Sequence, residues 1–488
     1  MTIGRKAIIS TFWTTGTTYI AMAVGFVFGV LRDRILQPYD NGIYAFGMAT
    51  VDLLFILSAL SFNISVIQAD EKKEDLYSTA FILTIALSLI MMLASLILAY
   101  VLSIRGTTDL KISAFLVLAS ASVLNLFSML FSSYLEKQLE YKRIARINLL
   151  SVLAFPVVSL FFVYHGWGAW GMILGQSASF LVSFTGMLII SRYPFGFRFS
   201  VSTAKWFLSM GWKLIFSRGM EVMLVHYGTF VTERLLGTAQ QGSYNRVVKY
   251  WQMAPQTVAP AVVTVALPTY SKLQQEGDKL SQAFSLVLFF LTRALLPFVL
   301  IFLFLPETFI RIIGTQWLDG VPVLRILAIS ALLSPLFENV KQLIISQGKP
   351  EKIVKTRIVQ LLVFIPSMYF FVDRFGISGA AIALTLNYFI GAIGAFILVR
   401  QFLSRRLIKN IAIPFLSASL AGCIQYFFPM PGVFDHSIPQ FFLSAFYLIA
   451  IFFLFEIMFE WKTLKEHSMF IVNIMRNHEA PTSPPLAQ

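Results

Sequence analysis

Long apolar stretches recur along almost the whole chain, and short polar segments separate them. A helix needs about 20 mainly apolar residues to cross the hydrocarbon core of a bilayer. The pattern predicts an all-α integral membrane protein with about 14 transmembrane helices, because a helix satisfies its own backbone groups in lipid. The expected spans are 8–31, 43–66, 77–104, 113–135, 147–164, 169–191, 207–236, 244–268, 282–304, 320–347, 357–373, 377–400, 411–428 and 439–461.

The composition agrees with this pattern and excludes two classes of protein. Hydrophobic residues make up 57% of the 488 residues and charged residues 13%, whereas a soluble domain carries about 25% charged residues. A soluble enzyme and a disordered chain are therefore excluded. The loops between the spans are short, at about 15 residues or fewer, and leave no room for a soluble catalytic domain.

The net charge of +14 indicates orientation in a membrane rather than a nucleic-acid partner. With the N-terminus placed inside, 24 of the 38 Lys and Arg residues fall in cytoplasmic segments and 7 in outer ones. Cytoplasmic loops carry an excess of basic residues. The bias therefore predicts that both the N-terminus and the C-terminus are cytoplasmic.

Two pairs of segments indicate an internal repeat. Residues 33–44 and 233–244 each begin with an acid followed by arginine, and they agree again at Leu36/Leu236, Gly42/Gly242 and Tyr44/Tyr244. At a slightly larger offset, Phe161-Phe162-Val163 before Gly168 is echoed by Phe370-Phe371-Val372 before Gly376. Six spans separate the members of each pair. This spacing predicts two parallel six-helix lobes related by an axis along the membrane normal.

The repeat divides the chain into four expected parts. Residues 1–204 form an N-lobe with helices 1–6, 205–408 a C-lobe with helices 7–12, 409–461 two further helices, and 462–488 a cytoplasmic tail. Two such lobes are the plan of an alternating-access transporter. The expected substrate route is the cleft between the lobes, lined by the first two spans of each.

Two cations within the eighth span are candidates for substrate binding, because a charged residue at the bilayer centre costs roughly 2.5–3.5 kcal/mol. Arg246 and Lys249 share a helix face, and no acid in that span offsets them. In a water-filled cleft they would form an anion site, since arginine binds phosphate in a bidentate manner. The alternative for Arg246 is that its side chain reaches the outer interface.

The seventh and second spans carry further ionisable candidates. Arg218 and Glu221 share a helix face and are expected to pair, as a structural or coupling element or, for Arg218, as a substrate contact. His226 could titrate with a proton flux or be a hydrogen-bonded structural histidine. Asp52 could balance the cations or bind a coupling ion.

The ends and bends of two spans supply the remaining candidates. Arg32 and Arg34 either mark the outer end of the first span or catch an anion at the outer mouth. Pro255 and Pro260 interrupt the hydrogen-bond ladder of the eighth span, as hinge elements or as packing features.

The sequence lacks the motifs of several catalytic classes. It contains no G-x-x-x-x-G-K-[ST] loop for ATP, no H-E-x-x-H zinc motif and no G-x-S-x-G nucleophile elbow. Cys423 is the single cysteine, which excludes an intrachain disulfide framework and a cysteine metal cluster. We therefore expect no cofactor, no metal and no catalysis, and a movement driven by an ion gradient, a partner or downhill substrate flow.

Short segments around the start of the second lobe carry a resemblance to a known family. They are Arg234-Leu235-Leu236-Gly237, Gly242-Ser243-Tyr244, Pro255 and Pro268-Thr269-Tyr270-Ser271-Lys272-Leu273, supported by the inner loop 135–141 and by Trp317. With these segments the chain resembles the bacterial polysaccharide and O-antigen repeat-unit flippases, the polysaccharide transport family of the multidrug/oligosaccharidyl-lipid/polysaccharide (MOP) exporter superfamily.

The resemblance implies a V-shaped transporter of two six-helix lobes and two extra helices in the bacterial inner membrane. It implies as substrate an undecaprenyl-pyrophosphate-linked oligosaccharide, moved from the cytoplasmic to the periplasmic leaflet for exopolysaccharide, O-antigen (lipopolysaccharide) or capsule synthesis. The pyrophosphate would fit Arg246 and Lys249. The polymerase and chain-length regulator of the same pathway would be partners.

Two other functions remain open from the sequence. An ion-coupled, drug-type exporter of the same superfamily would share the fold, but one for cationic drugs would be expected to place acids rather than cations in its cleft. A polysaccharide polymerase would be another many-helix membrane protein, but it would need a large outer loop, and the expected loops are short.

Overall fold

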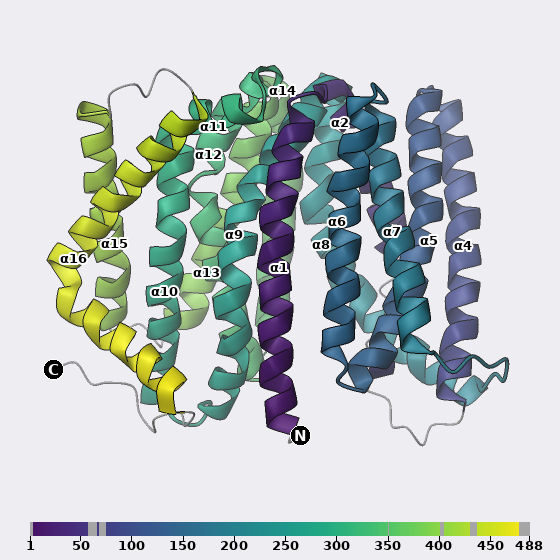
Figure 1. The fold of residues 1–488 in the computed structure, drawn as a ribbon, viewed down its shortest axis with the longest axis horizontal. Helices are drawn as coiled ribbons and strands as arrows, with labels where there is room; N and C mark the ends of the chain where they lie inside the picture. Colours follow the sequence, from purple (N-terminus) through teal and green to yellow (C-terminus); the bar gives the residue numbers. More distant parts are fainter. Residues whose placement is uncertain are drawn as a thin grey trace. The chain divides into compact units, whose positions relative to one another are not determined.

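The computed structural model describes residues 3–56, 66–67, 75–349, 351–400, 405–429 and 437–477. Within these ranges all regular structure is helical, and most helices are long rods (Figure 1). The chain divides by its contacts into two compact units, Met1–Asn245 (unit 1) and Arg246–Gln488 (unit 2).

Unit 1 is built around α5 and α7, which pack against each other and against most of the other helices of the unit. Its buried core includes Phe115, Phe131, Met91 and Ile173. The helices are α1 (Ile3–Asp33), α2 (Pro38–Leu54), α4 (Leu76–Ile104), α5 (Asp109–Lys137), α6 (Tyr141–Tyr164), α7 (Ala169–Ser191) and α8 (Val201–Leu236).

Unit 2 begins within α9 (Thr238–Lys272), whose first residues belong to unit 1. The helix α10 contacts α13, α15 and α16, so it lies at the centre of the unit. The helices after α9 are α10 (Gly277–Phe304), α11 (Pro306–Ile313), the 3₁₀ helix η2 (Thr315–Gly320), α12 (Val321–Leu327), α13 (Ser330–Ser346), α14 (Glu351–Val399), α15 (Arg405–Phe427) and α16 (Ile438–Asn477).

Each expected span coincides with a helical stretch of the structure. The spans 357–373 and 377–400 are the two parts of α14, on either side of Gly376, and the span 320–347 is α12 followed by α13. The end of the second expected span, at 57–65, lies outside the described residues.

A subset of the described helices meets the physical requirements for crossing a membrane. Among them, eight are long and apolar enough, or nine if Thr315–Leu327 and Ser330–Ser346, which meet at 48°, form one broken span. The predicted class, an all-α integral membrane protein, is thus confirmed.

The surface of α4 shows why the helices are stable in lipid. Leu89 and Leu93 are exposed, whereas Thr84, Ser88 and Ser95 are buried in unit 1. Each of the three buried hydroxyls donates a 2.8 Å hydrogen bond to the carbonyl four residues earlier in the same helix, which satisfies it without water. A helix of a soluble protein would show the opposite arrangement, with polar residues outside.

The second sequence echo corresponds to the same local structure in both units. Gly168 has φ 46° and ψ −120° before α7, and Gly376 has φ 59° and ψ −141° within α14. Only glycine adopts this region readily. A Cβ atom on Gly171 would lie 2.8 Å from Val163 N, and one on Gly379 would lie 2.9 Å from Val372 N. In each repeat the chain therefore turns at an equivalent glycine, Gly168 or Gly376. The following glycine, Gly171 or Gly379, packs against the Phe-Phe-Val segment of the same repeat.

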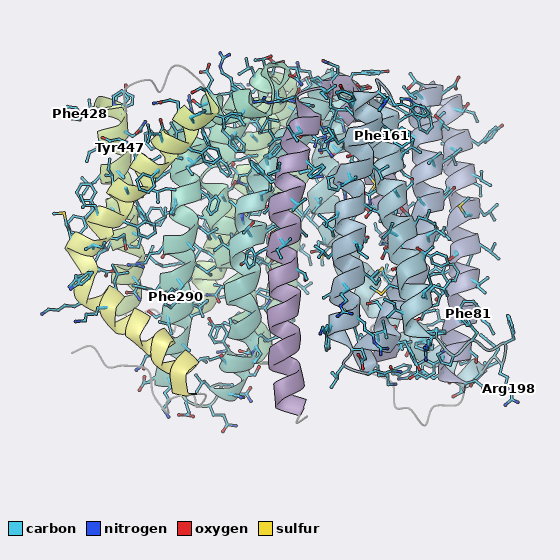
Figure 2. The ribbon with its side chains drawn as sticks, viewed as in Figure 1. Phe81, Phe161, Arg198, Phe290, Phe428 and Tyr447 are labelled. Carbon is cyan, nitrogen blue, oxygen red and sulfur yellow. The ribbon has the colours of Figure 1, made fainter. Side chains whose placement is uncertain are left out.

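Aromatic residues close one end of unit 1. Buried Tyr193, in the segment after α7, donates a 2.8 Å hydrogen bond to the Tyr77 carbonyl. Burial raises the pKa of the Tyr193 phenol, and the neighbouring Tyr77 and Tyr134 add to the rise, so the phenol stays neutral at ordinary pH. Figure 2 labels Phe81 and Arg198 toward the same end, where the N-terminus also lies. The N-terminal end of α1 and this basic connection thus lie at the same end of unit 1.

The two units differ from the lobes that the repeat predicts. The repeat places the boundary between residues 204 and 205, whereas the compact units meet at Asn245 and Arg246. The reason is that α8, the first helix of the second repeat, packs against α2 and α4. Units defined by contacts and lobes defined by sequence symmetry are different divisions, and the lobes stay a prediction.

Candidate functional site

An acid and a histidine meet between α2 and α8. His226 Nε2 lies 2.9 Å from Asp52 Oδ2, and the two side chains are 19% and 38% exposed. Each was a separate coupling candidate in the sequence. The pair therefore joins α2 to α8 through a short polar contact.

Glu221, the other candidate of α8 whose side chain the structure describes, is not beside this pair. Glu221 is exposed, five residues before His226, and five residues correspond to well over one turn of a helix. The side chain of Arg218 lies outside the described residues, so its expected pairing with Glu221 stays a prediction.

A second ion pair lies where α5 approaches the end of α8. Lys111 Nζ pairs with Glu233 Oε1, and both side chains are mostly buried. The same Glu233 oxygen accepts a 3.2 Å hydrogen bond from Thr238 Oγ1, and Lys111 Nζ lies 5.5 Å from the centroid of the Phe46 ring. Neither Lys111 nor Glu233 is a candidate for a site from the sequence alone.

The two copies of the first sequence repeat contact each other directly in the structure. Asn41 Nδ2 donates a 2.6 Å hydrogen bond to the Gly242 carbonyl. A Cβ atom on Gly242 would lie 2.7 Å from Gly42 N and would overlap with the Pro38 carbonyl oxygen. A Cβ atom on Gly42 would overlap with the Thr238 carbonyl oxygen. The repeated glycines therefore allow the start of α2 to cross the start of α9 backbone to backbone.

The two arginines at the end of α1 have different surroundings. Arg32 is buried and lies 2.9 Å from Asp33 Oδ1, while its Nη1 donates to Ser159 Oγ at 3.3 Å. Its guanidinium carbon is 5.2 Å from the centroid of Phe155. Arg34 is exposed. Of the two, Arg34 is the residue that an external anion can reach.

The two cations of α9 are also placed differently. Arg246 is 2% exposed, and its guanidinium carbon lies 5.6 Å from the centroid of Trp317 in η2. Lys249, three residues later, is exposed. An arginine stacked on an indole is held in place by the ring, whereas a surface lysine can move to meet a ligand.

The prolines expected to bend this helix lie within it. The helical assignment of α9 continues through Pro255 and Pro260. Pro255 is buried, and the side chain of Pro260 is outside the described residues. Their role as hinges stays a prediction. As for metals, the described residues contain no group of three or more His, Cys, Asp or Glu that could hold an ion.

Sequence comparisons relate the chain to proteins of polysaccharide biosynthesis. Residues 33–322 match a family model described as polysaccharide biosynthesis protein. The chain is 22% identical over 431 residues to the lipopolysaccharide biosynthesis protein WzxC of Escherichia coli (strain K12), covering 85% of this chain and 86% of that protein. It is 25% identical over 342 residues to the succinoglycan biosynthesis transport protein ExoT of Rhizobium meliloti (strain 1021), covering 68% and 67%.

Solved structures define the fold. The lipid II flippase MurJ in an inward closed conformation has a TM-score of 0.73 at 16% identity, with 92% of this chain and 99% of that chain covered. An inward-facing MATE family multidrug resistance transporter of the MOP superfamily has a TM-score of 0.63 at 15% identity, with 80% and 94% covered. The chain therefore shares its fold with these two transporters. The family model matches more than half of this chain, and the chain therefore belongs to the polysaccharide biosynthesis protein family.

Proposed function

We propose that this protein is a flippase that moves an undecaprenyl-pyrophosphate-linked oligosaccharide repeat unit from the cytoplasmic to the periplasmic leaflet of the bacterial inner membrane. The observation that carries the proposal is the family match over 33–322, which includes both copies of the first repeat and the basic stretch of α9. Two relatives support it by name, the lipopolysaccharide biosynthesis protein WzxC and the succinoglycan biosynthesis transport protein ExoT. The fold is shared with a flippase of another lipid-linked molecule, lipid II.

In this proposal the pyrophosphate binds at α9. Lys249 is exposed and can approach the phosphate oxygens as a mobile point charge. Arg246, fixed over Trp317, adds a permanent positive charge one helical turn away. Arg34 is the exposed cation at the end of α1 that would contact the headgroup at the outer mouth, and Pro255 and Pro260 would let α9 bend during the movement.

The energy source proposed for the movement is a proton that binds at the Asp52–His226 pair. The 2.9 Å separation lets the two groups share the proton, and imidazole titrates near physiological pH. Glu221 on the same helix is a further coupling candidate. No step of this process makes or breaks a covalent bond, so the protein acts as a transporter and not as an enzyme.

The proposed orientation places both termini in the cytoplasm, and the proposed partners are the polymerase and the chain-length regulator that use the translocated unit. The basic segment around Arg198 and the N-terminus lie at one end of unit 1 (Figures 1 and 2), as the positive-inside rule requires.

Deletion of the gene in its host, followed by lipid extraction and mass spectrometry, tests the activity. Single lipid-linked repeat units should accumulate, and they should be inaccessible to a membrane-impermeant glycosidase added from the periplasmic side. Units that reach the periplasm but stay unpolymerised would instead indicate a polymerase and would overturn the proposal.

The anion site is tested by complementing the deletion with variants of α9. Lys249→Ala should reduce translocation at a normal protein level, and Lys249→Arg should retain most of it because the charge is kept. Arg198→Ala, which removes an exposed cation outside the expected spans, is the matched control and should behave as wild type. Wild-type translocation by the Arg246→Ala/Lys249→Ala double variant would contradict the site while leaving the flippase activity intact.

A further inference from the structure

Unit 2 contains a buried ionic cluster that joins α10 to α16. Arg293 Nε lies 2.8 Å from Glu456 Oε2, and Arg293 Nη2 pairs with Glu460 Oε2. The side chains of Arg293, Glu456 and Glu460 are 6%, 0% and 1% exposed. This ionic triad is buried inside unit 2, whereas the Asp52–His226 pair belongs to unit 1.

The triad lies in two helices that are apolar enough to cross a membrane. Both α10 and the Ile438–Lys465 part of α16 meet that test. Arg293 Nη1 also donates to two main-chain carbonyls, Phe289 O at 3.1 Å and Asn410 O at 3.3 Å, the second of which belongs to α15. The guanidinium thus connects α10, α15 and α16 at one buried point.

The charges of the triad do not balance. Two ionised carboxylates facing one guanidinium leave one negative charge, and a buried charge without compensation is strongly unfavourable. The neighbours of the Glu456 carboxyl group are Arg293 Nε, at 2.8 Å from Oε2, and the neutral Ser417 of α15. A proton on one carboxyl group removes the excess charge.

The surroundings supply no second described cation. From α10 the neighbouring polar groups are Ser285 and Thr292, and from α15 they are Asn410 and Ser417, all of which are neutral. In α11, Glu307 and Arg311 pair with each other at the surface. On α16 itself, Lys462 and Lys465 are exposed. The basic side chains Arg405, Arg406 and Lys409 at the start of α15 lie outside the described residues.

The backbone of α16 leaves helical geometry at one member of the triad. Glu460 has φ −137° and ψ 29°, and Figure 1 shows α16 bent along its length. On a regular helix Glu456 and Glu460 would already share a face, four residues apart. Glu460, whose backbone is irregular, is also the residue whose carboxylate pairs with Arg293 Nη2. The irregular turn of α16 and the ionic triad therefore share this residue.

We propose that Arg293, Glu456 and Glu460 form a proton-binding site in which one proton is held on the two carboxyl groups, and that its release loosens α16 from α10. The site takes a proton because the triad is then neutral overall. When both carboxylates are ionised, their mutual repulsion acts on the irregular turn at Glu460. The proposal does not depend on what the protein transports.

The test is infrared spectroscopy of the full purified chain in detergent, between pH 5 and pH 9. At neutral pH the wild type should show the carbonyl band of a protonated carboxyl group. The band should be lost in the Glu456→Gln/Glu460→Gln double variant, and Glu307→Gln is the matched control that should keep it. A wild-type spectrum without the band at pH 6 would overturn the proposal. Loss of the band at constant pH on replacing K⁺ by Na⁺ would overturn it in favour of a sodium site.

Thermal unfolding at several pH values gives a second readout that does not depend on the band. If the folded chain holds one more proton than the unfolded chain at neutral pH, stability must fall as the pH rises through the release of that proton. The midpoint of unfolding should therefore decrease from pH 6 to pH 9 in the wild type and decrease less in Glu456→Gln, which is neutral at every pH. Equal slopes in the two proteins would contradict the site.

Discussion

Replacing Gly242 by alanine should open or destabilise the crossing of α2 and α9. The added Cβ atom would lie 2.7 Å from Gly42 N and would overlap with the Pro38 carbonyl oxygen. Both are backbone atoms, so no side chain can rotate away to make room. Overpacking of this kind costs roughly 1–3 kcal/mol. If the helices separate, the Asn41–Gly242 hydrogen bond is lost as well, at about 1 kcal/mol.

The measurement is unfolding of the purified protein in a denaturant series. We expect Gly242→Ala to lose about 3 kcal/mol in the free energy of unfolding, and Asn41→Ala, which removes the hydrogen bond alone, to lose about 1 kcal/mol. Gly25→Ala in α1 is the matched control, because no described atom lies within 4 Å of its added Cβ. In a helix that change should stabilise by roughly 0.5–1 kcal/mol. Equal stability of Gly242→Ala and Gly25→Ala would refute the argument.

Three other predictions concern the polar groups of unit 1. Lys111→Ala leaves the Glu233 carboxylate buried without its cation, and the free energy of unfolding should fall by about 3–5 kcal/mol. The double variant Lys111→Glu/Glu233→Lys, which restores a pair of opposite charges, should recover part of that loss in unfolding assays. His226→Gln should flatten the pH dependence of translocation between pH 6 and pH 8, because the Asp52 pair then lacks its titratable base; an unchanged profile would exclude coupling there. Burial raises the pKa of the Tyr193 phenol. Above a pH of about 10, the pKa of a tyrosine in the unfolded chain, the need to keep this phenol protonated therefore destabilises the fold. Alkaline unfolding should begin at higher pH in Tyr193→Phe, which has no ionisable group at this position.

The fold was predictable because its determinants are local. Each span is a run of apolar residues long enough for a bilayer, and such a run needs no knowledge of its neighbours. The repeat was also readable, since Gly168 and Gly376 occur at equivalent turns where another residue would be strained. Sequence similarity alone did not reveal that Gly42 and Gly242, matched as copies, lie against each other.

The pairing of charges could not be predicted, because it is not local. The sequence rule for helices relates residues three or four apart, and it led to the expected pair of Arg218 and Glu221. That pair stays a prediction, because the side chain of Arg218 lies outside the described residues. The contact of Asp52 with His226 joins residues that are far apart in the chain, so this rule could not find it. Such contacts depend on which helices pack together and in what rotation, and neither quantity follows from the hydrophobic pattern of single helices.

The buried arginines show that a charged residue within a span is not always evidence of a functional site. Arg32, Arg246 and Arg293 are each nearly inaccessible, and each lies over an aromatic ring, that of Phe155, Trp317 and Phe289, respectively. A guanidinium is weakly hydrated and stacks on such rings, so an arginine inside a span does not by itself require a water-filled cleft. An ammonium group is more strongly hydrated and lacks the planar face with which a guanidinium stacks on a ring. The exposed Lys249 is therefore a stronger indication of an anion site than Arg246, and substituting it is the more direct test of substrate binding.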